Sequence, residues 1–264
     1  MAIEAVSKTA IGVARVRAYE SSREGALFDD PYAAAFVTAA GPDGASQEEP
    51  TEQRRRLAFH VIIRTRYYDD YLRDAVTAGC RQVVLLAAGL DTRAFRLDWP
   101  AGTRLFEIDL PALLEVKETV LREQGAQPRC DRHVVAADLT GDWLAALTDA
   151  GFDPTARTAW LVEGLLVYLA RDDARQVLTT ITNASAPGST LAFERGSGAA
   201  AAVTAADTEA VTSLWRGGAG DDVAQWVEGL GWDVTVDNLG EVAAAYGRPT
   251  SRPTESAFLR LSKR

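Results

Sequence analysis

The sequence has few of the residues on which several protein classes depend. Among 264 residues there are two cysteines, Cys80 and Cys130, and two histidines, His60 and His133. Two thiols cannot build the disulfide scaffold of a small secreted protein, so we expect a reduced, cytoplasmic compartment. We also expect no metal, because the sequence offers no clustered ligand spacing.

Long apolar runs and basic charge are scarce as well. The most apolar stretch, 159–170, contains Glu163 and is shorter than the roughly 18 to 20 residues of a membrane span. The start of the chain, with Glu4 and Lys8, shows no secretory signal. A net charge of −9 would repel nucleic-acid phosphates. We therefore expect neither a membrane nor a nucleic acid as partner, and the sequence does not predict the oligomeric state.

The central part of the chain alternates between short apolar runs and helical patterns. This alternation is typical of an α/β domain with a parallel sheet and crossover helices. The expected strands are 82–87, 104–108, 133–136, 158–162 and 189–193, and the expected helices are 110–124, 143–150 and 172–185.

The two ends of the chain differ from this centre. Residues 5–40 look helical, with a helix start at Asp30-Pro31, and a second helix is expected over 52–78. In that second helix Tyr68 belongs to a predicted buried stripe, while Arg64 and Arg66 are expected to point elsewhere. Helices are expected over 199–215 and 222–230, and strands over 232–236 and 256–261 could pair antiparallel. We therefore divide the chain into an N-terminal helical lid, 1–78, and a core, 79–264, with an insertion at about 196–222.

Acidic residues or glycine follow four successive expected strands. They are Gly89, Asp109, Asp138 and Glu163. Because the carboxyl ends of parallel strands meet at one edge of the sheet, we expect these four residues in register around one crevice. A single acid there is usually a helix cap or a turn residue, but four together favour a ligand site.

Spacing suggests what the ligand contains. Asp109 lies 20 residues beyond Gly89, the offset at which a carboxylate accepts hydrogen bonds from a ribose diol. Asp138 and Leu139 suit an adenine, with the carboxylate near the exocyclic amine and the leucine against the ring. These positions favour an adenosine derivative over the carboxyl ends of the strands.

The glycine loop argues against a pyrophosphate. The loop is Ala87-Ala88-Gly89-Leu90-Asp91, with one glycine where a dinucleotide fingerprint has three. Asp91 would repel a phosphate and attract a cationic group. A nucleoside that carries a sulfonium or ammonium and no phosphate, such as S-adenosylmethionine, fits this charge.

These segments resemble the leucine carboxyl methyltransferase family, in particular its bacterial, actinobacterial-type branch of S-adenosylmethionine-dependent methyltransferases. The segment Leu86–Leu97 (LAAGLDTRAFRL) resembles the first motif of the family. Further similar segments are Phe106–Pro111, Ala137–Leu139 and Trp160–Leu169, with weaker ones at Asp30–Tyr32, Ser185–Ser189 and Ala245–Pro249.

The resemblance implies a fold, a reaction and a set of residues. It implies a class I methyltransferase fold, a doubly wound Rossmann-like sheet that is mostly parallel with a C-terminal antiparallel hairpin, beneath an N-terminal helical lid. It assigns cofactor contacts to Gly89, Asp91, Asp109, Leu110, Asp138, Leu139 and Glu163. It also implies that an arginine before the first strand reaches the methionine carboxylate, with Arg64 first, Arg66 second, and Arg17 as a further cation near the cofactor.

The expected reaction is O-methylation of a small-molecule acceptor, with a carboxylate favoured, in secondary metabolism. A carboxylate is ionised at neutral pH and needs no general base, whereas a phenol would need one. Catalytic candidates are Tyr168, past the fourth strand, and His60 on the helix of Arg64; His133 is expected to be structural. Arg93, Arg195 and Arg216 could hold an anionic acceptor, although each is better explained as a solvated or structural residue, and Trp215 could hinge a flap.

Two other hypotheses remain open. An NAD(P)-dependent oxidoreductase is supported by the 20-residue offset to Asp109, but the glycine loop and the lack of a Tyr-x-x-x-Lys pair oppose it. A non-catalytic protein that keeps the cofactor pocket would bind the cofactor without turnover.

Overall fold

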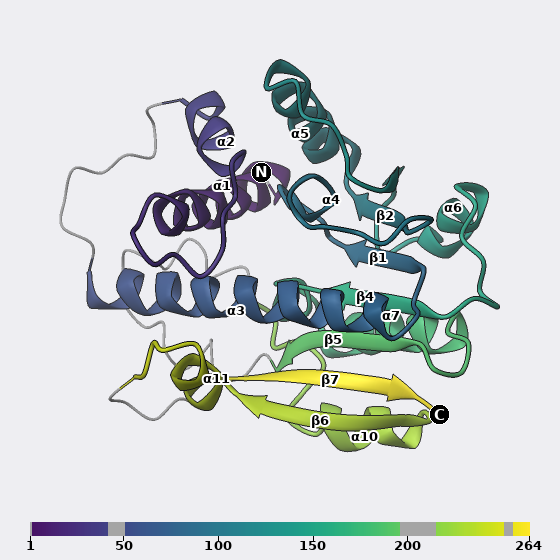
Figure 1. Cartoon of the computed structure of the whole chain (residues 1–264). Coiled ribbons are helices and arrows are strands. Elements are labelled where there is room, and N and C mark those ends of the chain that lie inside the picture. Colours follow the sequence, from purple (N-terminus) through teal and green to yellow (C-terminus); the bar gives the residue numbers. More distant parts are fainter. Residues whose placement is uncertain (1, 42–50, 196–214, 251–255) are drawn as a thin grey trace.

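A computed structural model describes residues 2–41, 51–195, 215–250 and 256–264, with the side chains of residues 2–8 excepted. Within these ranges seven strands form one sheet in the order β3-β2-β1-β4-β5-β7-β6 (Figure 1). They are β1 (Gln82–Leu86), β2 (Arg104–Asp109), β3 (Asp131–Ala136), β4 (Thr158–Val162), β5 (Thr190–Arg195), β6 (Trp232–Asn238) and β7 (Ala257–Lys263).

The pairing confirms the predicted sheet. Strands β1 to β5 are parallel, and β7 lies antiparallel between β5 and β6. All seven strands overlap those expected from the sequence. The strand order steps outward in both directions from β1, and such a reversal creates the crevice in which open α/β sheets bind ligands.

Helices cover both faces of the sheet (Figure 1). In β1, Val83 and Leu85 belong to one core and Val84 and Leu86 to the other, as the two-residue period of a strand requires. The first core includes residues of α3 (Glu52–Thr77), α5 (Pro111–Glu123) and α11 (Leu239–Ala245). The second includes residues of α6 (Trp143–Asp149), α7 (Arg171–Asn183) and α10 (Val223–Gly229). The sheet is therefore doubly wound.

Helix α3 is the element that connects this sheet to the N-terminal segment. It starts after Thr51, whose hydroxyl oxygen accepts a hydrogen bond from the Arg54 N–H. Near its C-terminus the Tyr71 hydroxyl donates to the Trp160 carbonyl oxygen, in the middle of β4. Since α3 has 26 residues, its first half extends past the carboxyl end of β4 (Figure 1).

The prediction that residues 5–40 are helical, with a helix start at Asp30-Pro31, is correct in part. Two helices, α1 (Ala2–Ser21) and α2 (Ala33–Ala39), are separated by an irregular segment. Gly25 in this segment has a φ of 69°, and Asp30 accepts hydrogen bonds from the N–H groups of Tyr32 and Ala33. The predicted helix start is therefore correct in place, and the chain before it turns because a left-handed residue cannot continue a helix.

Some sequence expectations have other outcomes. Helix α11 and the short helix α4 (Arg93–Arg96) were not predicted as helices. The helix expected over 199–215 and most of the insertion at 196–222 lie outside the described residues. The structure contains both cysteines as free thiols. In the described ranges, no helix combines the length and the apolar character needed to cross a membrane.

A buried ionic cluster joins β2, α5 and β3. The Glu107 carboxylate accepts hydrogen bonds from Lys117 and Arg132, each at 2.7 Å, and the side chains of Glu107 and Lys117 are fully buried. Burying these charges is costly unless each keeps its partner. The cluster therefore fixes α5 against the edge of the sheet on which Asp109 lies.

Lys117→Met should lower the free energy of unfolding by about 3 kcal/mol, because one of the two cations on a buried carboxylate is lost. Urea denaturation followed by circular dichroism measures this change. Arg56→Met is the control, since the Arg56–Glu52 pair is exposed and should contribute little. Equal effects of the two substitutions would contradict this role of the buried pair.

Candidate functional site

The turn after β1 has an unusual backbone. Ala87 and Gly89 have φ values of 49° and 50°. Left-handed backbone is unfavourable for alanine and persists where the surrounding structure enforces it, often at binding sites. The turn is held to β2 at two points: the Ala88 N–H donates to the Ile108 carbonyl oxygen, and the Gly89 N–H donates to the Asp109 carboxylate at 2.6 Å.

Asp109 was expected to lie opposite this turn, and its carboxylate also forms a hydrogen bond with it. Its second carboxylate oxygen accepts a hydrogen bond from the Leu110 N–H at 2.7 Å. Burial raises the pKa of Asp109 above its usual value, although the hydrogen bonds from the Gly89 and Leu110 N–H groups partly offset this rise. Each carboxylate oxygen has a further lone pair, so Asp109 can still accept two hydroxyl donors.

The strand register changes which of the predicted residues lie side by side at the ends of the strands. Leu86, Ile108, Val162 and Phe193 are paired across β1, β2, β4 and β5, so the residues that follow them in β2, β4 and β5 are Asp109, Glu163 and Glu194. Asp138 is not in this row, because Asp109 pairs with Ala136 and Asp138 lies two residues further on. Glu194, near the end of β5, is the third carboxylate of this row.

Arg64 connects two of these carboxylates to α3. Its Nε donates to Glu163 at 2.8 Å and its Nη1 donates to Glu194 at 2.7 Å. The other Glu194 oxygen accepts a hydrogen bond from the Gly164 N–H. Burial raises the pKa of Glu194, but Arg64, His60 and the Gly164 N–H together outweigh burial and lower it to about 2. The expectation that Arg64 points away from the buried stripe is wrong.

Arg93 lies at the centre of the same ionic network. Its side chain is 2% exposed and donates to Asp69 and Glu163, each at 2.7 Å, and to Asp91. Asp69 is also bound by Arg96. Burial raises the pKa of Asp91, but Arg93, Lys117 and Arg96 together outweigh burial and lower it to about 2. Arg93 is therefore a structural residue, one of the two roles expected for it.

Two other predicted cations lie in different surroundings. Arg17 donates to Asp30 at 2.8 Å and to the carbonyl oxygen of Leu90 at 2.6 Å, which places it beside the glycine turn. Arg66 instead binds Asp70 and the Leu27 carbonyl oxygen. Of the two arginines predicted on α3, the structure thus brings Arg64 to the strand ends and gives Arg66 partners elsewhere.

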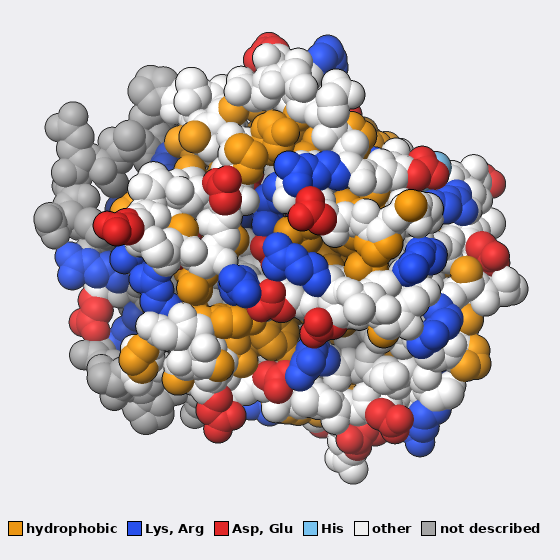
Figure 2. Space-filling view, in the orientation of Figure 1, with side chains coloured by type: hydrophobic (Ala, Val, Ile, Leu, Met, Phe, Trp, Pro, Cys, Tyr) orange, Lys and Arg blue, Asp and Glu red, His pale blue; other side chains and the backbone are white. Residues whose placement is uncertain are grey.

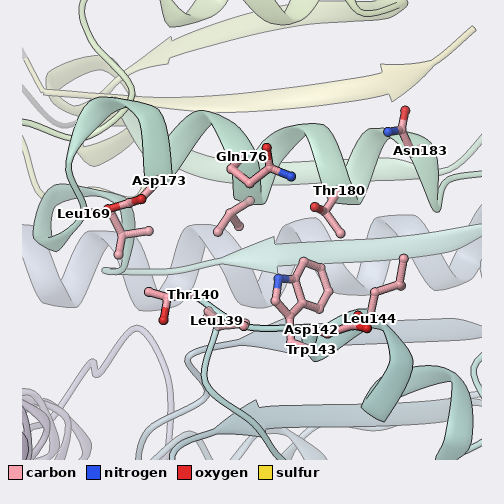
Figure 3. A pocket seen from close by; sticks show the side chains of 12 residues that line it. Leu139, Thr140, Asp142, Trp143, Leu144, Leu169, Asp173, Gln176, Thr180 and Asn183 are labelled. Atoms are coloured by element: carbon pink, nitrogen blue, oxygen red, sulfur yellow. The ribbon is translucent and has the colours of Figure 1, made fainter.

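One of the two predicted adenine residues, Leu139, lines a groove. Asp138 is exposed and accepts hydrogen bonds from the N–H and hydroxyl of Thr140, which lower its pKa. Leu139 lies at one end of a groove of about 360 Å³ between the start of α6 and the side of α7 (Figure 3). Gln176 and Thr180 of α7 line the opposite wall, above the Trp143 indole.

The two catalytic candidates, His60 and Tyr168, lie on different elements. His60 Nε2 is 3.8 Å from Glu194 Oε1. Tyr168, in a 3₁₀ turn (Leu166–Tyr168), is partly buried, and burial raises the pKa of its hydroxyl. The neighbouring segment is anchored to that turn, since the Arg216 N–H donates to the Val167 carbonyl oxygen. The flap hinge at Trp215 and the acceptor roles of Arg195 and Arg216 stay predictions.

The charges of the site favour a cationic ligand. The network of strand ends, α3 and α4 holds five carboxylates and three guanidiniums, an excess of two negative charges; the members are Asp69, Asp91, Asp109, Glu163, Glu194, Arg64, Arg93 and Arg96. Among the described residues, no group of three or more His, Cys, Asp or Glu side chains could hold a metal ion. On the face shown in Figure 2, acidic and basic side chains are interspersed rather than gathered into a patch of one sign.

Comparison with known proteins identifies the family. The family model for leucine carboxyl methyltransferase matches residues 10–182, which include every strand-end residue above except Glu194. The chain belongs to the leucine carboxyl methyltransferase family. A protein of Streptomyces avermitilis is 47% identical over 94% of this chain and 90% of its own length. One of Frankia alni is 48% identical over 98% and 95%. Both are provisionally named S-adenosyl-L-methionine-dependent methyltransferases.

Solved structures agree on the fold. A DUF574 family protein from Streptomyces avermitilis superposes with a TM-score of 0.62 and 16% identity, covering 95% of this chain and 97% of the other. Magnesium protoporphyrin IX methyltransferase from Synechocystis, solved with bound SAH, superposes with a TM-score of 0.53 and 11% identity over 96% and 100%. The fold expected from the sequence, that of class I methyltransferases, is confirmed.

Sequence reasoning missed three residues of the ionic network, namely Glu194, Asp69 and Arg96. Glu194 could have been found, because it ends the fifth predicted strand as Glu163 ends the fourth. Asp69 gives no such signal. Its role depends on α3 crossing α4, and no spacing in the sequence reports that contact.

Gly164→Ala should destabilise the protein by more than the cost of placing alanine in a left-handed backbone conformation. Gly164 has a φ of 65°, and an added Cβ would lie 3.3 Å from Arg64 Nη1. We expect a loss of about 2 kcal/mol in the free energy of unfolding, half from left-handed strain and half from displacement of Arg64. Urea denaturation measures it.

Gly25→Ala is the matched control for this prediction. Gly25 has a similar φ of 69°, and an added Cβ there would meet nothing within 4 Å. We expect a loss of only about 1 kcal/mol from strain. Equal losses for the two variants would show that Arg64 tolerates the added methyl group.

Proposed function

We propose that this chain transfers the methyl group of S-adenosylmethionine to an oxygen atom of a small-molecule acceptor, with a carboxylate favoured. The class of reaction and the methyl donor follow from membership of the leucine carboxyl methyltransferase family and from its relatives' names. The acceptor and the oxygen atom are our inference. The observation that supports the cationic methyl donor at this site is the anionic network around Gly89, Asp109 and Glu163.

The residues present fit this cofactor. Asp109 keeps two free lone pairs for the ribose hydroxyls, and a Cβ at Gly89 would have its nearest neighbour at 3.9 Å, so the space above the turn is open. The cofactor carries a sulfonium, an ammonium and a carboxylate, a net charge of +1. The net charge of −2, in which the guanidinium of Arg64 is already counted, complements the net charge of +1 on the cofactor, and Arg64 can pair with the cofactor's carboxylate.

Each residue would then have a defined part in binding. Asp109 would hold the ribose, Asp138 and Leu139 the adenine, and Arg64 the carboxylate, while Glu163 and Asp91 would face the ammonium. Gly89 and Leu110 fix the orientation of Asp109 through their N–H groups. When bound, S-adenosylmethionine supplies an electrophilic methyl group. The protein contributes orientation, which can account for about 7 to 11 kcal/mol of a barrier in favourable cases.

A carboxylate acceptor agrees with the residues near Arg64. It is ionised at neutral pH, so the site need not supply a base. Burial raises the pKa of the Tyr168 hydroxyl, which makes it a hydrogen-bond donor and a poor base. His60 is near a carboxylate, Glu194, that is itself bound by Arg64 and Gly164.

The other two functions receive less support. A nicotinamide cofactor would place a pyrophosphate beside Asp91, whose pKa of about 2 keeps it charged. The family is one of methyltransferases, which does not favour an oxidoreductase. A non-catalytic protein would bind the cofactor and show no turnover with any acceptor, an outcome that the experiments below would reveal.

Asp109→Ala should weaken S-adenosylhomocysteine binding by about tenfold to hundredfold, because hydrogen bonds to a charged acceptor are lost. Isothermal titration calorimetry measures the affinity. Asp131→Ala, at the opposite end of β3, is the control and should bind as the wild type does. Absence of binding by the wild type, or undiminished binding by Asp109→Ala, would overturn the proposed function.

His60→Ala should leave kcat within about threefold of the wild type if the acceptor is a carboxylate, since no proton must be removed. Release of S-adenosylhomocysteine is measured with a panel of small carboxylic acids and with the matching alcohols and phenols. A loss of about a hundredfold that is restricted to hydroxyl acceptors would instead identify His60 as a general base for a hydroxyl group.

A further inference from the structure

One face of α3 carries three polar residues at the strand ends. His60, Arg64 and Tyr68 are spaced four residues apart, so they lie on one face of the helix. His60 lies near Glu194, and Arg64 binds both Glu194 and Glu163. Only the third residue, Tyr68, has no role in the site described so far.

The Tyr68 hydroxyl is buried without a partner. The residue is 0% exposed, and no atom of the described residues forms a hydrogen bond with its hydroxyl. A buried hydroxyl that lacks a partner costs free energy, so it needs an explanation. Removing it should not destabilise this arrangement of the protein.

Tyr68 lies close to Glu194. Its ring packs edge-on against Phe258 at 5.6 Å between centroids, and Phe258 is the cross-strand partner of Glu194 between β5 and β7. Cross-strand partners point to the same face of a sheet, here the face that α3 covers. Burial raises the pKa of Tyr68 most, and Glu194 then raises it more than Glu163 does.

Arg64 is the residue whose bonds change if a ligand carboxylate takes both of its Nη groups. An arginine binds a carboxylate most strongly when two parallel N–H groups of its guanidinium donate to the two carboxylate oxygens. In the structure Nε is bound to Glu163 and Nη1 to Glu194. A third carboxylate at Arg64 weakens its hold on Glu194, which would then need another donor.

We propose that Tyr68 is a positioning residue for cofactor binding. Its hydroxyl donates to Glu194 when Nη1 of Arg64 turns from Glu194 to the carboxylate of the cofactor. Glu163 keeps Arg64 in place through Nε, and Glu194 keeps its bond from the Gly164 N–H. This inference rests on the proposed function, because it requires a ligand with a carboxylate at Arg64.

Tyr68→Phe tests the proposal against a matched variant, Tyr71→Phe. Tyr71 is also buried on α3, but its hydroxyl bonds with the Trp160 carbonyl oxygen at 3.0 Å and with the Thr190 hydroxyl at 2.9 Å. Both variants are examined without ligand by thermal unfolding and with S-adenosylhomocysteine by isothermal titration calorimetry. Each removes one oxygen atom from the same helix.

The two variants should behave oppositely. Tyr68→Phe should keep or raise the Tm of the ligand-free protein and weaken S-adenosylhomocysteine binding by about tenfold. Tyr71→Phe should lower the Tm and bind within about twofold of the wild type. Wild-type affinity in Tyr68→Phe, or a fall in its Tm equal to that of Tyr71→Phe, would overturn the proposal. If the wild type itself does not bind, the proposed function fails instead.

Discussion

The buried pairing of Arg64 and Arg93 with Glu163 is the interaction on which the site depends. One carboxylate at the end of β4 holds a guanidinium from α3 and another from α4. Without it each arginine would lose one buried carboxylate partner and keep the others, Glu194 for Arg64 and both Asp69 and Asp91 for Arg93. Helix α3 and the turn after β1 are therefore held in place relative to the sheet by the same charged residues that would bind the ligand.

This network explains why the first part of α3 continues beyond the sheet. Tyr71 anchors α3 to the middle of β4, and two turns earlier Arg64 reaches past the end of that strand. A cation thus stands above a row of carboxylates that ends β2, β4 and β5. The arrangement has excess negative charge and one accessible guanidinium end, and this combination suits a cationic ligand that also carries a carboxylate.

Strain and burial concentrate at the same edge of the sheet. Ala87 adopts a left-handed backbone, Asp109 is buried against two N–H groups, and the Tyr68 hydroxyl has no partner among the described residues. Each of these features is unfavourable in isolation. Together they indicate a site organised for a bound group rather than for stability alone.

The sequence by itself determined the doubly wound sheet, the identity of the glycine turn, and the placing of Asp109 and Glu163 at strand ends. Apolar runs, turn residues and the spacing from Gly89 to Asp109 are local signals, and the family motif lies within them. The tertiary contacts add that Glu194 belongs to the row and Asp138 does not, that Arg64 faces inward and Arg66 does not, and that Arg93 is buried. These outcomes depend on strand register and on how α3 crosses the sheet, and both are set by contacts between residues far apart in the chain.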